Sequence, residues 1–388
     1  MNVKNAVNNK IILIGSNHHN GLGLARSFAK YGIKPYGIIC SKSGENFIFQ
    51  SRYWEKTILI ESEKQIVDVL LSSFSEEKCK PVIITYSDSA EAVIDSNLNV
   101  LSEHFILPSI NNEQGKIVCL MNKQAQYEFC TCAGVEMLPS QILDIEDVMY
   151  WHIDMLPIII KPVSSYSGDK KDIVIIHSEE ELERATRELE QKGYNKVLAQ
   201  KYLEKRKEYL IVGSILANDY SYSMCENIRQ WPPDTGSGSY SRITCNKELD
   251  AFCRKVLGII QKEGYRGCID IELFGDEKGD YYVNEINWRS SGRNYICAFT
   301  GAQSSVAYYY DRVGNARYCG ELINKKEGYA INGFADIRNV LLAHNTNPVR
   351  WLMEYCNANA HSVIDMHDMG PFFSKCLSGL RVLSRRKR

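Results

Sequence analysis

The sequence lacks an apolar run long enough to cross a bilayer, because residues 11–14 are followed at once by Gly15 and polar residues. The same run is too short for the apolar core of a signal peptide. The sequence also lacks a charge imbalance: 46 Lys and Arg against 47 Asp and Glu leave a net charge of −1. We therefore expect no nucleic-acid partner, no membrane partner and no export.

Paired cysteine spacing is absent as well, although the chain has 13 cysteines. An odd number of scattered thiols suits a reducing compartment better than a disulfide framework, so we expect a cytoplasmic protein. The nearest pair, Cys130 and Cys132, lies two residues apart on a predicted helix, where the side chains do not face each other. Two buried thiols are therefore a better interpretation than a zinc site.

The length of 388 residues predicts two or three domains, and 44% hydrophobic with 24% charged residues is ordinary for a globular chain. Strand-like and helix-like segments alternate over the first hundred residues, which is typical of a parallel α/β domain. The expected strands are residues 10–14, 35–39 and 82–85, and the expected helices are residues 22–31 and 66–74.

The loop after the first expected strand contains Gly21 and Gly23 but no complete dinucleotide-binding motif. Arg26 occupies the position of the third glycine, and the second strand ends at Cys40 and Ser41 without an acidic residue. A nicotinamide-dependent oxidoreductase is thereby disfavoured, while a structural turn and a small-molecule site both stay open. His18 and His19 precede the glycines, but adjacent side chains point apart, so we expect no shared metal.

A second region of mixed helices and strands begins near residue 116. A helix is expected over residues 122–133, with Gly134 as its stop. Two strands, residues 157–161 and 173–176, flank a polar tip at residues 164–170. The further expected elements are strands at residues 197–203, 208–216, 267–274 and 280–287, and helices at residues 247–263, 333–344 and 348–356.

Carboxylates gather on two of these strands, which a short acidic turn joins into a hairpin. Alternation places Asp270 with Glu272 on one face of the first strand, and Glu285 with Asn287 on one face of the second. Carboxylate and amide oxygens are the ligands that Mg²⁺ prefers, so the pattern favours a metal site over a solvated acidic face.

In this order along the chain, the polar residues resemble the ATP-grasp superfamily over about residues 1–310. The residues that carry the resemblance are Asn122-Lys123, Ile160-Lys161-Pro162, the Ser/Gly loop, Gln200-Lys201-Tyr202-Leu203, Glu208, Glu272 and Glu285-Ile286-Asn287-Trp288-Arg289. The resemblance implies an α/β fold, α+β within the grasp. It places a Rossmann-like pre-ATP-grasp domain at residues 1–112 and an ATP-grasp domain of two α+β lobes at residues 113–325, with a mobile lid at about 150–205. A C-terminal helical extension, residues 326–388, would pack on the body.

The resemblance also implies a role for each matching residue. Lys123 and Lys161 would contact the phosphates of ATP, under a flap that includes Ser164, Ser165, Ser167 and Gly168. Gln200, Lys201 and Leu203 would border the adenine, and Glu208, or its rival Glu204, would bind the ribose. Glu272, Glu285 and Asn287 would hold two Mg²⁺ ions, which Mn²⁺ could replace, and Asp270 is an alternative to Glu272.

The expected chemistry is that of an ATP-dependent carboxylate–amine ligase, similar to D-aspartate ligases and other amino-acid ligases. Lys161 and Arg289 would stabilise the charge of the transferred phosphate. The candidates for contacts with a small-molecule carboxylate or amine are Arg229, Arg293 and Asp88. Arg229 lies in residues 227–241, which we expect to be a loop, either beside the acceptor pocket or simply on the surface.

Two alternatives to this chemistry stay open, a bicarbonate-using carboxylase and a non-catalytic nucleotide-binding protein. Many members of the superfamily are dimers, so a homodimer is compatible with the resemblance. The sequence itself does not decide the oligomeric state. No cysteine is required by the chemistry, so the thiols are expected to be dispensable.

Overall fold

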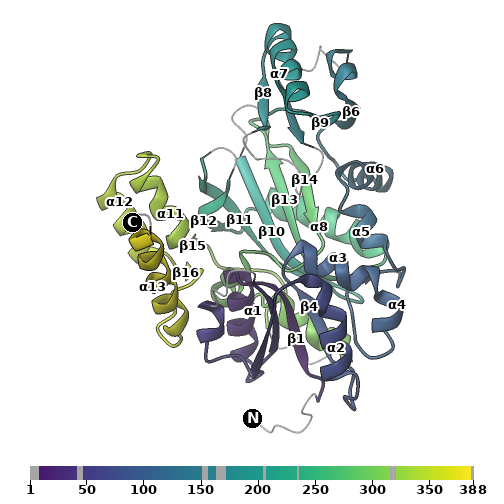
Figure 1. Cartoon of the computed structure of the whole chain (residues 1–388), viewed down its shortest axis with the longest axis vertical. Helices are drawn as coiled ribbons and strands as arrows, with labels where there is room; N and C mark the ends of the chain where they lie inside the picture. Colours follow the sequence, from purple (N-terminus) through teal and green to yellow (C-terminus); the bar gives the residue numbers. More distant parts are fainter. Residues whose placement is uncertain are drawn as a thin grey trace. The chain divides into compact units, whose positions relative to one another are not determined.

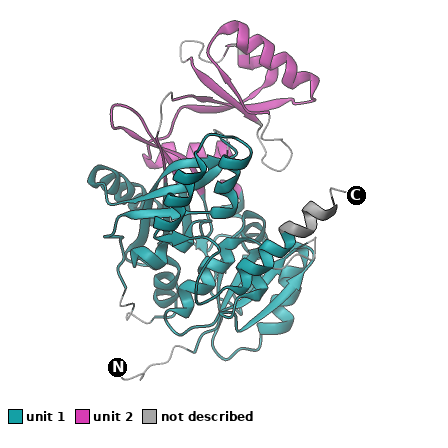
Figure 2. Ribbon diagram, turned by 90° about the vertical axis from the view of Figure 1, so that its left-hand side faces the viewer, with its two compact units in different colours: residues 1–118, 210–271, 287–388 teal, residues 119–209, 272–286 magenta. Residues whose placement is uncertain are grey.

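The computed structural model describes residues 8–41, 47–150, 156–162, 172–203, 207–233, 236–314, 318 and 320–385. The chain divides into two compact units (Figure 2). Unit 1 comprises residues 1–118, 210–271 and 287–388, and unit 2 comprises residues 119–209 and 272–286. Three of the four crossings between the units fall inside strands β10, β13 and β14, whose bounds are given below.

Unit 1 begins with the expected parallel sheet, whose strand order is β3-β2-β1-β4. Figure 1 labels two of its neighbouring strands, β1 and β4. Its elements are β1 (Ile11–Ser16), α1 (His19–Ala29), β2 (Tyr36–Cys40), β3 (Lys56–Ile60), α2 (Ile66–Phe74), β4 (Val82–Thr85), α3 (Asp88–Ser96) and α4 (Leu98–Leu101). Ile11 and Leu13 pack with α1, whereas Ile12 and Ile14 pack with α2 and α3. Both faces of β1 are therefore covered, which explains its unbroken apolar run.

The largest sheet has eight strands in the order β14-β13-β10-β11-β12-β15-β16, with β5 paired to β13. Its strands are β5 (Ser109–Ile110), β10 (Lys207–Ile215), β11 (Tyr220–Trp231), β12 (Ser237–Thr244), β13 (Tyr265–Gly275), β14 (Tyr281–Asn287), β15 (Gly328–Ile331) and β16 (Ala360–His361). The expectation of a loop over residues 227–241 was wrong. Those residues belong largely to the antiparallel hairpin of β11 and β12, in which Ser239 and Ser241 are buried and Arg229 pairs with the buried Asp336.

Unit 2 contains a four-stranded antiparallel sheet of order β6-β9-β7-β8. The strands are β6 (Ser140–Asp144), β7 (Ile158–Pro162), β8 (Val174–Ile176) and β9 (Lys196–Lys201). Helix α7 (Glu179–Gln191) is capped by the Ser178 side chain and packs Leu182, Ala185 and Leu189 into the core of this sheet. The short helix α5 (Lys116–Leu120) and helix α6 (Lys123–Ala133) precede the sheet.

The remaining helices of unit 1 include the expected C-terminal pair. They are α8 (Lys247–Lys262), α9 (Cys297–Thr300), α10 (Ser304–Arg312), α11 (Gly333–Leu341), α12 (Pro348–Asn357) and α13 (Gly370–Arg385). Unit 1 also has short 3₁₀ helices at Phe47–Gln50, Glu63–Gln65 and Asn294–Ile296, and unit 2 has one at Ile145–Tyr150. None of the helices in the described ranges has the length and apolar character that crossing a bilayer requires.

A buried ion pair connects the first helix of unit 1 to its C-terminal region. Arg26 donates from Nε to Asp368 at 3.0 Å and from Nη2 to the carbonyl oxygen of Val363 at 2.8 Å. Asp368 also accepts hydrogen bonds from the Ser51 hydroxyl and the Arg52 backbone N–H. Since Asp368 is 3% exposed, this junction is part of the interior of unit 1.

Candidate functional site

A small pocket in unit 2 brings together residues from five separate segments of the sequence. Lys123, Lys161, Gln200 and Glu285 are the members of its lining that the sequence singled out, and Gln126, Tyr127, Met137, Ser140, Leu198 and Asn284 complete it. Two ammonium groups and one carboxylate thus share a pocket with amide and hydroxyl groups. Such a set of donors suits a polyanion accompanied by a cation.

Lys161 is held in place by a chain of hydrogen bonds across the sheet of unit 2. Its strand, β7, is apolar up to Ile160 and pairs with β9, so that Ile159 lies opposite Gln200. The Lys161 ammonium donates to Gln200 Oε1 at 2.8 Å, and Gln200 Nε2 donates to the Ser140 hydroxyl at 2.9 Å. Because Gln200 is only 3% exposed, its amide fixes the position of the lysine ammonium.

Gln126, which the sequence analysis did not single out, positions the helix that carries Lys123. Its amide donates to the carbonyl oxygen of Ile286 at 2.8 Å and accepts from the N–H of the same residue at 2.8 Å. The paired hydrogen bonds join α6 to β14 and bring Lys123 and Glu285 into one pocket. The sequence could have indicated only that Gln126 lies beside Lys123, because it follows that lysine by three residues on the same helix face.

Glu285 is half-buried and, among the described residues, has neither a hydrogen-bond partner nor an ion-pair partner. A carboxylate in this position is available to a cation, since buried charges are otherwise paired. Glu272, on the neighbouring strand, accepts a 3.4 Å contact from Asn284 Nδ2. Oxygen ligands of this kind fit Mg²⁺, although the described residues contain no cluster of three or more His, Cys, Asp or Glu side chains.

The expected adenine and ribose contacts are only partly described. The backbone N–H groups of Lys201 and Tyr202 donate to the carbonyl oxygens of Pro139 and Pro157, both at 2.9 Å, so neither is left for a ligand. Glu208 lies half-buried on β10. The residues outside the described ranges are the flap residues Ser164, Ser165, Ser167 and Gly168, and Glu204, the alternative to Glu208.

In unit 1, Arg289 lies between two carboxylates. Its Nη1 donates to Asp270 at 2.8 Å, and its Nε lies 3.1 Å from Asp88. Burial raises the pKa of Asp270, and the attraction of Arg289 opposes that shift. The structure therefore places Asp270 as a partner of Arg289 rather than as a replacement for Glu272.

Arg293 is 8% exposed and packs against the hairpin of β11 and β12. It donates from Nη1 to the side-chain oxygen of Asn227 and to the Cys225 sulfur, and Gly238 makes room for it, because a Cβ there would lie 1.8 Å from Nη2. Among the described residues no carboxylate forms an ion pair with Arg293. A buried guanidinium with neutral partners attracts an anion.

The two histidines at the start of α1 touch each other, contrary to the expectation that they point apart. Their ring centroids are 3.9 Å apart, because His18 is the extended residue before the helix and His19 is its first residue. Burial lowers the pKa of His18 to about 4 and that of His19 well below its ordinary value. Both imidazoles are therefore neutral near pH 7.

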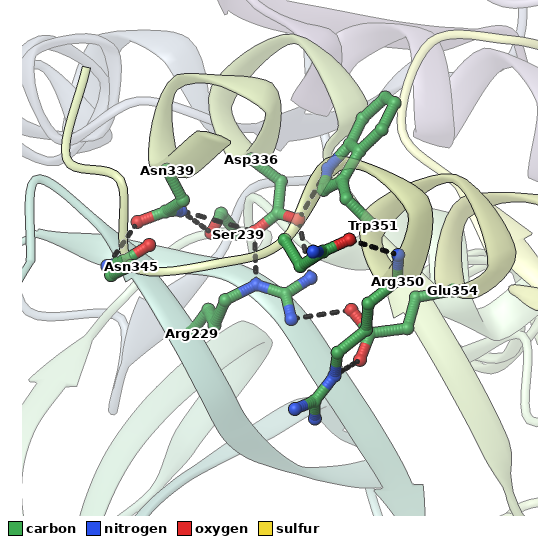
Figure 3. Close-up of polar contacts among 9 residues, drawn as sticks. Arg229, Ser239, Asp336, Asn339, Asn345, Arg350, Trp351 and Glu354 are labelled. Carbon is green, nitrogen blue, oxygen red and sulfur yellow. Dashed lines mark hydrogen bonds and ion pairs between the residues drawn. The ribbon is translucent and has the colours of Figure 1, made fainter. Parts of the chain in front are cut away.

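Arg229 has a structural role in unit 1 (Figure 3). It forms a two-point interaction with Asp336, at 3.2 and 2.7 Å, and its Nη1 lies 2.6 Å from Glu354. Asp336 is fully buried and also accepts hydrogen bonds from Ser239 and Trp351. Two carboxylates thus already bind the guanidinium, which argues against the expected contact between Arg229 and a substrate.

No protein-family model matches the chain. A relative in sequence is the D-aspartate ligase of Enterococcus faecium (strain Aus0004), 22% identical over 332 residues that cover 78% of this chain and 76% of that protein. The biotin carboxylase domain of the Hydrogenobacter thermophilus 2-oxoglutarate carboxylase, solved with MgADP and bicarbonate, superposes with a TM-score of 0.63. It is 19% identical, and the match covers 82% of this chain and 73% of that one.

The L-amino acid ligase of Bacillus licheniformis superposes with a TM-score of 0.62 at 16% identity, over 83% of this chain and 79% of that one. These likenesses, together with the combination of parallel and antiparallel sheets, define the ATP-grasp fold. Within that class, the relatives are ligases and carboxylases, and both the sequence relative and this structural neighbour are amino-acid ligases.

Proposed function

We propose that the protein is an ATP-dependent ligase that joins a carboxylate, an amino acid, to an amine through an acyl phosphate. The observation that carries the proposal is the pocket in unit 2, which Lys123 and Lys161 line together with Glu285, a carboxylate that has no partner among the described residues. Two cations and a carboxylate free for a metal suit the phosphates of a nucleotide. The likeness to two amino-acid ligases supports amide formation rather than another use of ATP.

In the proposed reaction a carboxylate oxygen attacks the γ-phosphorus of ATP, and the bond to the β–γ bridging oxygen breaks to release ADP. The amine nitrogen then attacks the acyl carbon, the acyl C–O bond breaks, phosphate leaves and the nitrogen loses a proton. Lys123 and Lys161 bind the phosphates, the edge from Gln200 to Leu203 borders the adenine, and Glu208 binds the ribose. Catalysis is then positioning and charge stabilisation.

Glu272 and Glu285 would hold Mg²⁺, with Asn287 next on the same face of β14. A bound Mg²⁺ would supply positive charge to the phosphate oxygens. Arg289, oriented by Asp270 and Asp88, stabilises the negative charge of the acyl phosphate. Arg293 attracts the substrate carboxylate, since within the described residues its hydrogen-bond partners are neutral and the only carboxylate acting on it, that of Asp270, is already bound by Arg289.

The proposal is tested by phosphate release from Mg-ATP with L- and D-amino acids, singly and in pairs, and with mass detection of the products. Release that requires two substrates and yields a new amide mass is expected. Release that depends on bicarbonate instead would identify a carboxylase, and ATP binding without turnover on any substrate would favour a binding protein. Either result overturns the ligase assignment.

Two variants sharpen this test. Glu285→Gln should abolish turnover while the protein stays folded, because it removes a carboxylate that the metal needs. Asp280→Asn, in the exposed turn between β13 and β14, is the matched control and should leave turnover unchanged. Full activity of Glu285→Gln at ordinary Mg²⁺ concentrations would remove Glu285 from the proposed metal site.

A further inference from the structure

A second cavity, with a volume of about 780 Å³, lies wholly within unit 1 and shares no lining residue with the pocket of unit 2. Its walls come from α1, α9, the end of α12 and the segment that follows β16. The size falls in the range of small-molecule sites, about 300–1,000 Å³. None of the chemistry proposed above uses this cavity.

Aromatic side chains form much of the wall. Tyr53, Tyr295, Phe299 and Tyr355 come from four different elements. Tyr355 meets the ring of His361 at a centroid distance of 4.8 Å, and this ring also lines the cavity. Rings in such an arrangement bind the apolar body of a ligand.

One cation in the wall has donors to spare. Lys30, near the end of α1, uses one N–H on the carbonyl oxygen of Ala298 at 2.9 Å. An ammonium has three donors, so two remain, and among the described residues Lys30 forms no ion pair. Arg26 lines the same cavity, but Asp368 and the Val363 carbonyl oxygen already bind its guanidinium. Lys30 is therefore the group that remains for a carboxylate.

An anion in the wall complements that cation. One oxygen of the Asp365 carboxylate accepts from the His367 N–H at 2.8 Å. The other oxygen forms an ion pair with Arg26, 3.7 Å from Nε, which is beyond hydrogen-bonding distance. The His367 ring Nδ1 also lies 3.7 Å from the first oxygen. Attraction between Asp365 and Lys30 raises the pKa of the lysine, although burial has the larger effect and lowers it. The cavity thus offers one cation and one anion around an aromatic body.

We propose that this cavity binds a zwitterion with a large apolar body, its carboxylate on Lys30 and its ammonium on Asp365. A free aromatic amino acid and a short apolar dipeptide share that chemistry. The site is separate from the groups proposed to act on ATP, so it stands or falls independently of the proposed function. Tyr295 links the cavity to the histidine pair, since its ring lies 6.1 Å from that of His19.

The test is isothermal titration calorimetry on the full chain without nucleotide. The probes are L-phenylalanine, the dipeptide of two phenylalanines, phenylalaninamide, N-acetylphenylalanine and glycine. L-phenylalanine and the dipeptide are the two zwitterions with an apolar body. The one that binds more tightly should bind at least tenfold more tightly than phenylalaninamide, which lacks the carboxylate, and than N-acetylphenylalanine, which lacks the ammonium. Glycine, which lacks the apolar body, should not bind.

Variants then locate the bound molecule. Lys30→Gln should weaken binding of the zwitterion at least tenfold. Asp365→Asn should weaken it equally, and its side-chain oxygen can still accept the hydrogen bond from the His367 N–H. Lys326→Gln is the matched control, because Lys326 is exposed and lies 5.7 Å from the ring of Phe299 without lining the cavity. Thermal unfolding checks that each variant is folded.

Three results would overturn the proposal. The first is that none of the zwitterions binds. The second is that phenylalaninamide or N-acetylphenylalanine binds as tightly as the zwitterion, because recognition would then not need both charges. The third is binding that Lys30→Gln leaves unchanged in a folded protein, which would place the ligand elsewhere.

Discussion

Arg289 donates a 2.8 Å hydrogen bond to Asp270, whose side chain is 8% exposed. A charged group on the segment after β14 is thus held by a residue of β13. The second carboxylate at Arg289, that of Asp88, is 54% exposed. Asp270 should therefore hold Arg289 in place more strongly than Asp88 does. Exposed ion pairs contribute about 0–1 kcal/mol, whereas buried ion pairs are costly to break.

Asp270→Asn keeps the size of the side chain but removes the charge that orients Arg289. We expect kcat to fall by about 10- to 100-fold, the equivalent of about 1.4–2.7 kcal/mol, with little change in the KM for ATP. Asp88→Asn is the control and should change kcat less than threefold. Steady-state kinetics on the folded variants measures both. Equal effects of the two substitutions would show that burial does not decide which partner orients Arg289.

Lys161→Gln should raise the KM for ATP by about 10- to 100-fold, because a hydrogen bond to a charged group contributes about 1.5–3 kcal/mol. Lys196→Gln is the matched control on the same sheet. That lysine is 61% exposed and lies 3.6 Å from Asp144, so its loss should not affect nucleotide binding. Steady-state kinetics measures the KM for ATP, and calorimetric titration measures the affinity of each variant for ATP. Equal ATP affinities for the two variants would contradict the role of Lys161.

Arg229→Ala should lower the free energy of unfolding by about 3–5 kcal/mol, because it leaves the buried Asp336 without its cation. Turnover per folded molecule should stay within about threefold of the unchanged protein. Arg350→Ala, whose side chain is 71% exposed, removes another cation from Glu354 and should cost less than about 1 kcal/mol. Urea unfolding measures the free energy of unfolding of each variant, and steady-state kinetics measures its turnover. A stable but inactive Arg229→Ala would restore this arginine as a substrate contact.

Glu91 should make the stability of the protein depend on pH. It is completely buried, its carboxylate accepts a hydrogen bond from Thr85, and burial raises its pKa to about 8. A raised pKa in the folded state means that the contribution to stability is complete below the unfolded-state pKa, about 4.5, and is lost as the pH rises through 8.

Urea unfolding at pH 6 and pH 8.5 tests this expectation. Glu91→Gln should show a smaller fall in stability between the two pH values than the unchanged protein, whereas Glu103→Gln, an exposed control, should show the same fall. An unchanged pH dependence in Glu91→Gln would mean that Glu91 is already ionised at pH 6.

The elements of the fold were largely predictable because their signals are local. The apolar run of β1 and the helix stop at Gly134 each identify an element from a few neighbouring residues. The hairpin of β11 and β12 was missed because its polar residues resemble a loop. Arg229 lies in the hairpin with its charge balanced by Asp336 and Glu354, which follow more than a hundred residues later.

The candidate site was predictable in its residue types but not in its contacts. Lys123, Lys161 and Glu285 were identified from their order along the chain, and one pocket contains all three. The sequence carries no sign of the Gln126 hydrogen bonds to Ile286, since they join segments 160 residues apart. The three domain bounds, the two-ion metal site, the homodimer and the cytoplasmic location stay predictions.

The division of the chain between the units also sets an order for folding during synthesis. Every residue of unit 2 has been made once residue 286 has been added, whereas unit 1 draws on residues up to 388. The guanidinium of Arg26 must wait for Asp368, which is 342 positions later. On the ribosome, all residues of unit 2 are therefore present before unit 1 is complete, and the Arg26 side chain of α1 is without its carboxylate partner until the chain is almost finished.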